Sequence, residues 1–241
     1  MKFLAAIFFG LVLLAGSGWA HTMSQQNFAC PVCEKKFTQV MDGSGTQFGQ
    51  QLDLRPLGPT PAPWAIPVCP QCHFVLLKEP DETYSPAELV DFRAFVETAA
   101  YRQAGKQDSS YYLLALLQEH LGSPNSNIGY SYLRASWQAD GDADRQKHYL
   151  QRTLEKYAAA LADTGRPLEA DTAVTAKLVV GECFRRLGRF AEAAAHFAKL
   201  GQDPAFADGL LAGIVQQQVA LVKARDSAPH AIEDKTHPER G

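Results

Sequence analysis

The sequence predicts a mainly α-helical protein in which a small β module, bearing four cysteines, precedes a layer of stacked helical hairpins. Three observations predict this class. Four of the five cysteines lie before residue 85, and nine of the 14 prolines fall between Pro31 and Pro86. From residue 85 onward, apolar residues recur at the 3.6-residue period of a helix. Glycines then separate the periodic segments at helical lengths, as expected of helix ends.

The composition is that of a globular protein of one or two domains. The chain has 241 residues, of which 46% are hydrophobic and 20% charged. These values exclude a disordered chain and a membrane protein with many spans. The formal net charge is −3, so there is no basic excess to neutralise phosphates, and we expect no nucleic-acid partner.

Residues 1–20 have the pattern of a secretory signal peptide. Lys2 precedes an apolar run of 13 residues from Phe3 to Ala15, and Gly18 and Ala20 offer a small-x-small cleavage site before His21. A membrane-spanning helix needs about 20 apolar residues. We therefore expect a periplasmic or secreted protein of the cell envelope, with a cleaved signal and no stable membrane insertion afterwards. An uncleaved anchor is the alternative.

Residues 21–84 are expected to form the β module. Segments 37–41 and 46–54 have the composition of strands, and the intervening Asp-Gly-Ser-Gly at 42–45 predicts a hairpin turn between them. Five prolines between residues 56 and 67 exclude a helix or a central strand there. This stretch is predicted to be an extended loop.

Residues 85–225 are expected to form about seven helices. Ser85, Pro86 and Glu88 give a helix start with a capping box, and this helix is predicted to run to residue 104, with Gly105 as its stop. The other helices are predicted at 110–121, 127–139, 143–162, 169–187, 190–200 and 204–224. The polar residues 226–241 lack periodicity and are predicted to be a disordered tail.

The strongest chemical signal is a pair of Cys-x-x-Cys motifs. Cys30 and Cys33 form the first, and Cys69 and Cys72 follow after 35 intervening residues. Two such turns can supply four thiolates to one tetrahedral metal ion. Zinc is the expected metal, because it accepts four thiolates and needs no redox partner; such a closed site would be structural.

Two alternatives to zinc remain open. Residues 64–72 are similar to the second Cys-x-x-Cys turn of rubredoxins, which bind iron, although Glu34 and His73 stand where rubredoxins usually have glycine. Export favours oxidation, so two disulfides or a redox-active dithiol are the other alternative. The fifth cysteine, Cys183, lies among apolar residues of a predicted helix and is expected to be buried and inert.

A partner-binding face is predicted on the helix at 127–139. Tyr130, Arg134 and Trp137 are spaced at i, i+4 and i+7, so they share one helix face. In stacked hairpins this face would line a groove for a protein or peptide, where Arg134 could stack on an aromatic ring or pair with a carboxylate. The alternative is that both aromatic side chains are buried and Arg134 extends past them to solvent.

The sequence contains no motif for catalysis. We find no glycine-rich phosphate loop, no nucleophile elbow and no His-Glu-x-x-His. We therefore expect a non-enzymatic binding or scaffolding module. A periplasmic thiol–disulfide redox protein or a rubredoxin-like electron carrier is the alternative function, and a hydrolase is the least supported.

Two family resemblances follow from these motifs. The Phe-Ala-Cys-Pro-Val-Cys start at 28–33, Phe37 and the Val-Cys-Pro-Gln-Cys-His-Phe stretch at 68–74 resemble an uncharacterised bacterial family, domain-of-unknown-function 2225. That resemblance implies a metal-binding zinc ribbon joined to helices and implies no reaction. Residues 178–204 resemble a tetratricopeptide unit, which implies stacked hairpins with a concave binding face.

Overall fold

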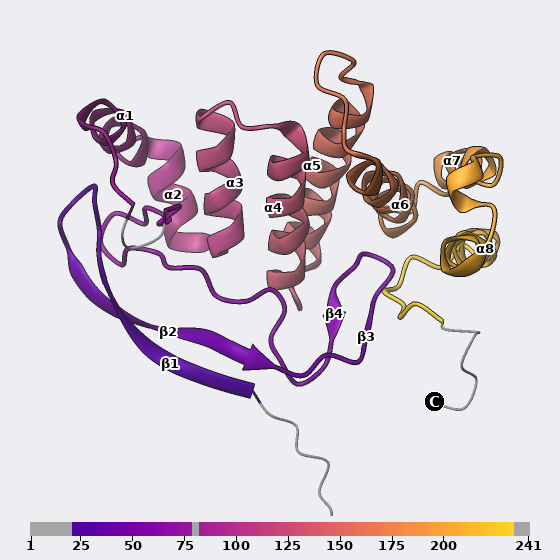
Figure 1. Cartoon of the computed structure of the whole chain (residues 1–241), viewed down its shortest axis with the longest axis horizontal. Coiled ribbons are helices and arrows are strands. Elements are labelled where there is room, and N and C mark those ends of the chain that lie inside the picture. Colours follow the sequence, from indigo (N-terminus) through magenta and orange to yellow (C-terminus); the bar gives the residue numbers. More distant parts are fainter. Residues whose placement is uncertain (1–20, 79–81, 234–241) are drawn as a thin grey trace, which may run out of the picture.

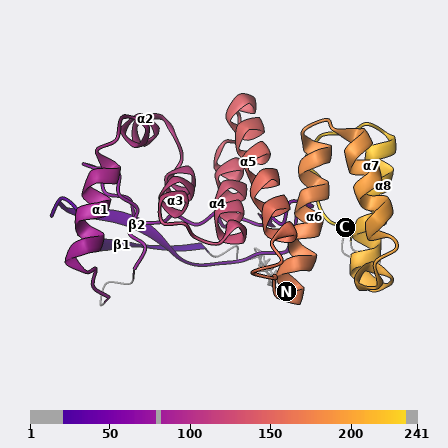
Figure 2. The ribbon, with the colours of Figure 1, turned by 90° about the horizontal axis from the view of Figure 1, so that it is seen from above.

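The computed structural model describes residues 21–78 and 82–233 and shows a single row of helices (Figure 1). Viewed from above, α1 to α8 follow one another along the row in sequence order (Figure 2), and the strands lie below the row in the view of Figure 1. The helices of the described residues are α1 (Pro86–Val96), α2 (Ala99–Gln107), α3 (Ser110–His120), α4 (Asn125–Gln138), α5 (Ala143–Ala162), α6 (Ala170–Arg186), α7 (Phe190–Leu200) and α8 (Gly209–Lys223), with a 3₁₀ turn at Pro204–Phe206. The mainly α class with an N-terminal four-cysteine β module is confirmed.

Each helix packs on the next one along the chain, so the core is a line of apolar clusters between neighbours. The contact between α6 and α7 depends on Gly181. A Cβ atom at this position would lie 2.4 Å from the Phe197 ring, so only glycine lets the two helices approach this closely.

The long first helix predicted at 85–104 is two helices. The capping box of Ser85 and Glu88 is present at the start of α1, but α1 ends at Val96. Thr98 then caps α2, where its hydroxyl oxygen accepts from the Tyr101 N–H. The Thr98 side chain favours a new helix start over a continuous helix, because it accepts a hydrogen bond from a backbone N–H that has no partner within α2. Gly105 lies inside α2 and does not end a helix.

The hairpin of the β module lies elsewhere than predicted. Strands β1 (His21–Ala29) and β2 (Lys36–Gly45) pair antiparallel, and the connection between them is the first Cys-x-x-Cys turn. Residues 42–45 are therefore inside β2 and form no turn. The sequence did not predict the pairing of β1 with β2. Strand β1 is polar and mostly exposed, so it lacks the alternation of apolar residues that identifies a strand.

The N-terminal block contacts helices along the whole row. Phe74 and Val75 pack on α1 and α2. Beyond them, β3 (Gly49–Gln50) and β4 (Pro56–Leu57) form a second small sheet, and Leu52 between them is buried among α6, α7 and α8. This insertion joins the two ends of the molecule (Figure 1).

Part of the predicted disordered tail is ordered. The Ile232 N–H donates to the Gln50 carbonyl at 2.8 Å, and the Leu52 N–H donates to the His230 carbonyl at 2.9 Å. Residues 226–233 are thus tied to the loop between β3 and β4 by backbone hydrogen bonds, which a composition-based prediction cannot detect. Residues 234–241 lie outside the described residues.

The predicted signal peptide, residues 1–20, also lies outside the described residues. Within 21–78 and 82–233, none of the helices combines the length and the apolar character that a bilayer crossing requires.

Candidate metal centre

The two Cys-x-x-Cys turns have the same backbone structure. In the first, the Cys30 N–H donates to Lys35 and the Glu34 N–H donates to Cys30; in the second, the Cys69 N–H donates to Phe74 and the His73 N–H donates to Cys69. All four bonds measure 2.9 Å. Each turn thereby directs its two cysteine side chains toward the same side.

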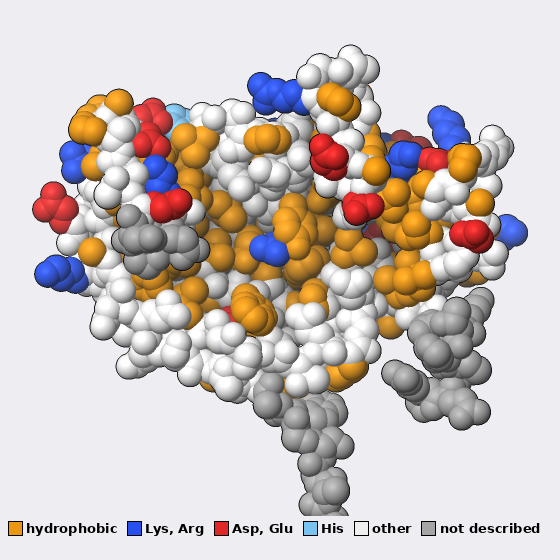
Figure 3. Space-filling view, in the orientation of Figure 1, with side chains coloured by type: hydrophobic (Ala, Val, Ile, Leu, Met, Phe, Trp, Pro, Cys, Tyr) orange, Lys and Arg blue, Asp and Glu red, His pale blue; other side chains and the backbone are white. Residues whose placement is uncertain are grey.

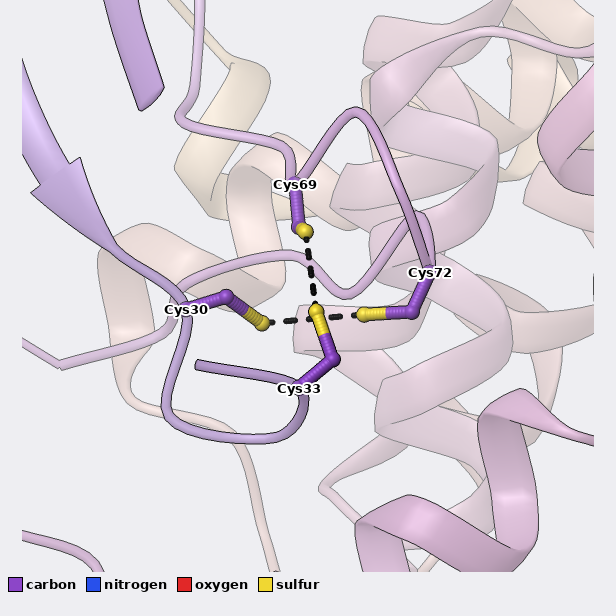
Figure 4. A group of neighbouring side chains, drawn as sticks. All are labelled: Cys30, Cys33, Cys69 and Cys72. Atoms are coloured by element: carbon purple, nitrogen blue, oxygen red, sulfur yellow. Dashed lines mark hydrogen bonds between the residues drawn. The ribbon is translucent and has the colours of Figure 1, made fainter. Parts of the chain in front are cut away.

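The two turns face each other and bring the four sulfurs together (Figure 4). The Sγ atoms of Cys30 and Cys72 are 3.6 Å apart, those of Cys33 and Cys69 are 3.5 Å apart, and all four lie within 4.8 Å of one another. A tetrahedral ion with bonds of about 2.3 Å requires sulfurs about 3.8 Å apart. All five cysteines are free thiols, so neither pair forms a disulfide here.

The first two helices hold the turns in place. The Arg93 guanidinium of α1 donates to the Val32 carbonyl in the first turn at 2.9 Å. The Tyr101 hydroxyl of α2 donates to the His73 carbonyl in the second turn at 2.9 Å. Cys30 and Cys69 are buried, whereas Cys33 and Cys72 are half-buried, so the centre sits at the edge of the core with one side near solvent.

The close packing of thiols changes their acidity. The hydrogen bond with Cys72 is the main cause that lowers the pKa of Cys30 to about 5, and the same contact raises the pKa of Cys72. Burial raises the pKa of Cys69. The close contact with Cys72 thus favours the thiolate form of Cys30, and a bound cation would favour the thiolate form of all four cysteines.

The donor set fits a metal ion. Four sulfur ligands in a nearly tetrahedral arrangement are typical of zinc and of iron bound by cysteine. With all four positions taken by protein, such an ion would have no open position for substrate, so the arrangement can stabilise the fold or carry electrons but offers no Lewis-acid catalysis.

Glu34 and His73, which stand where rubredoxins usually have glycine, have a left-handed backbone, with φ of 61° and 60°. His73 also explains Gly105, because a Cβ atom at residue 105 would lie 2.4 Å from its ring. Residue 105 must be glycine for the second turn to dock on α2.

We expect Gly105→Ala to lower the free energy of unfolding by about 1–3 kcal/mol, because the new methyl group overlaps the His73 ring. Adding His73→Gly removes the ring and suits the left-handed φ, so the double variant should regain most of the loss. Urea unfolding of the four chains of this cycle measures the coupling. Additive effects of the two substitutions would contradict the contact.

The predicted partner-binding residues are only partly where the sequence placed them. Tyr130 is 39% exposed, but Trp137 is 5% exposed, and its indole N–H donates to the Asp53 carboxylate at 3.1 Å. Trp137 is therefore buried and held by Asp53, whereas the sequence-based expectation places it in an open groove, although it still lines the same cavity as Tyr130 and Arg134. Arg134 stacks on the Tyr130 ring, with its guanidinium carbon 4.1 Å from the ring centre.

The sequence analysis did not predict a buried ionic network between α6 and the loop that contains Asp53. Glu182 and Arg185 of α6 are fully buried and paired at 2.7 Å, and Arg186 lies 3.8 Å from Asp53. Burial raises the pKa of Glu182 and of Asp53. The available signal was Glu182 among the apolar residues 178–184, followed by the two arginines 185 and 186. Helix-dipole reasoning explains arginines at the end of a helix without burial.

Together, the fold and site define a class: a helical-layer protein with a four-cysteine metal-type centre at its N-terminal end. Residues 23–222 match a family described as "Uncharacterized protein conserved in bacteria (DUF2225)". The chain belongs to this family, and the resemblance seen in the sequence is confirmed. No curated protein and no solved structure matches the chain.

Proposed function

We propose that this protein is an exported, zinc-binding and non-enzymatic module that binds a protein or peptide in the cell envelope. The observation that carries the zinc proposal is the group of four free thiols within 4.8 Å of one another. Zinc would join the two turns and stabilise a module whose own apolar core is small.

The proposal of zinc over iron rests on the structure of the turns. Glu34 and His73 occupy left-handed positions, so each turn carries a side chain where the turns of rubredoxins usually have glycine. The Tyr101 hydroxyl and the Arg93 guanidinium bind backbone carbonyls of the turns, as expected of a centre built for rigidity.

Metal analysis of the full chain, purified without oxygen, tests this function. We expect one zinc per chain, less than about a tenth of that in Cys33→Ser, and an unchanged content in Cys183→Ser, the matched control whose thiol is buried far along the sequence in α6. Iron with visible absorption would replace the zinc proposal by electron transfer. An absence of metal from the native chain would contradict both.

A thiol–disulfide redox function is the second candidate, and one observation favours it: Cys33 and Cys72 are free and only half-buried. A dithiol catalyst would reduce insulin disulfides with a rate that depends on Cys33. If zinc closes the site, we expect the native chain to show no more activity than Cys33→Ser.

The binding role rests on the row of helices. We propose that α6 and α7 are a tetratricopeptide-like unit, supported by the close approach at Gly181, the left-handed Gly188 with φ of 72° and the buried Ala193. Repeats of this type use an open face to hold peptides. A cavity lined by α4 and by the start of α6 offers such a face.

Export is a proposal that the first 20 residues support. We expect mass spectrometry of the envelope form to give a chain that begins at His21, because Gly18 and Ala20 suit signal cleavage. A mature chain that retains Met1 would contradict cleavage and would favour an anchored protein.

A further inference from the structure

A cavity of about 790 Å³ lies between the proline-rich loop and the helices α4 and α6. In the space-filling view, hydrophobic side chains gather in the hollow beneath the row of helices, with a basic side chain among them (Figure 3). The volume is in the range of sites that hold small ligands. Its walls come from segments far apart in sequence, namely 47–66, α3, α4, α5 and the start of α6.

Arg134 is the cation of this cavity, and it forms no ion pair within the described residues. Its two terminal nitrogens donate to the Tyr111 and Tyr130 hydroxyls at 3.2 and 2.7 Å. Its Nε atom is buried and has no hydrogen-bond partner. A guanidinium that is stacked on Tyr130 and bonded only to neutral hydroxyls retains its full attraction for an anion.

The loop side of the cavity keeps the arginine in position. The Tyr111 hydroxyl, which accepts from Arg134, itself donates to the Trp64 carbonyl at 3.1 Å. Trp64 is 40% exposed at the same cavity. An exposed tryptophan and the exposed Tyr130 therefore flank the arginine, which gives a ligand two aromatic surfaces beside one charge.

The other lining residues restrict the kind of anion. Asp171 is the second charged group of the lining, so the cavity is formally neutral overall, which suits a singly charged carboxylate better than a phosphate with two charges. The amide side chains of Gln47, Gln50 and Asn127 also line it. Amides can donate to and accept from a peptide backbone.

We propose that this cavity binds a short peptide segment through a carboxylate that pairs with Arg134, while apolar parts of the peptide contact Trp64 and Tyr130. This inference deepens the proposed binding function and rests on it. The carboxylate is either the C-terminus of the peptide or an acidic side chain, and the experiment distinguishes these two sources.

The test is retention of three pools of randomised N-acetyl tripeptides on the immobilised full chain, read by mass spectrometry. The first pool lacks Asp and Glu and has a free C-terminal carboxylate; the second is the same pool amidated; the third is amidated with Asp or Glu in the middle. We expect the first or the third pool, which carry a carboxylate, to be retained about tenfold or more over the second pool, which carries none. A charge-assisted hydrogen bond predicts a difference of this size.

Retention of the first pool identifies a C-terminus, and retention of the third identifies an acidic side chain. Arg134→Gln should abolish the difference between pools, and Arg134→Lys should reduce it because the planar guanidinium is lost. Arg102→Gln is the matched control, since Arg102 is an exposed arginine of α2 away from the cavity.

Tryptophan fluorescence gives a second readout. Of the three tryptophans, Trp19 lies in the predicted signal peptide, and both others line the cavity, so a bound peptide should change the emission of the mature chain. Equal retention of the amidated pool, retention that survives Arg134→Gln, or no retention of any pool would overturn the inference. Zinc content measured on the same preparations shows separately whether the metal proposal holds.

Discussion

If the four cysteines bind zinc as proposed, its removal is expected to unfold the N-terminal module and to loosen α1 and α2 in the full chain. The cysteines are part of the core that they hold, because Cys30 and Cys69 are buried in one cluster with Phe74 and Phe92. Binding of a structural zinc contributes an apparent 10–16 kcal/mol in small domains, which matches or exceeds the whole stability of a typical domain. Without an ion, contacts among the four sulfurs cannot supply this free energy.

Hydrogen exchange with and without a strong chelator measures this effect. We expect amide protection to be lost in the two cysteine turns and in α1 and α2, and to be retained in α6, α7 and α8, whose apolar cluster contains none of the four cysteines. Cys183→Ala, at a buried cysteine outside the group of four, should lose protection on chelation in the same segments as the native chain. Protection of the turns that is unaffected by chelation would contradict a structural metal.

Loss of the Arg185 side chain is expected to lower the free energy of unfolding by about 3–5 kcal/mol, because the buried Glu182 carboxylate loses its ion pair at 2.7 Å and keeps only Arg186 at 4.0 Å. Arg185 also donates to the carbonyls of Asp226 and Ala228 at 2.7 and 2.8 Å. Arg185→Met would thus release residues 226–233 from α6 as well. Urea unfolding measures the loss.

The pH dependence of this variant has a definite sign. Burial already raises the pKa of Glu182 above its ordinary value of 4.5, and removal of Arg185 raises that pKa further. The folded variant then keeps a proton that the unfolded chain releases above pH 4.5, so its stability falls as the pH rises. We expect a larger deficit against the native chain at pH 8 than at pH 5.

Two further variants distinguish the effect of the buried charge on stability from the effect of lost packing. In Arg185→Met with Glu182→Gln the unpaired charge is absent, so part of the loss should be recovered. Arg102→Ala removes a pair whose side chains are both more than half exposed and should cost less than about 1 kcal/mol. A deficit in Arg185→Met that is independent of pH would contradict a buried, unpaired carboxylate as its cause.

Features that depend on neighbours along the chain could be predicted from the sequence alone. The Cys-x-x-Cys spacing identified the four cysteines, since each turn is closed by hydrogen bonds between residues four or five apart. The capping box at Ser85 fixed the start of α1. The apolar period located most helices to within a few residues, because a helix is held together by contacts between residues three or four apart.

Features that join residues far apart in the chain became known only from the folded structure. The β1–β2 pairing, the insertion of Leu52 among α6 to α8 and the docking of residues 226–233 on the loop near Gln50 each join distant segments. The cavity at Arg134 is of this kind too, since the loop that closes it reaches α4 from about 70 positions earlier in the chain. Local periodicity contains no information on such contacts, because their free energy comes from burial and hydrogen bonding between surfaces that meet only when the chain folds.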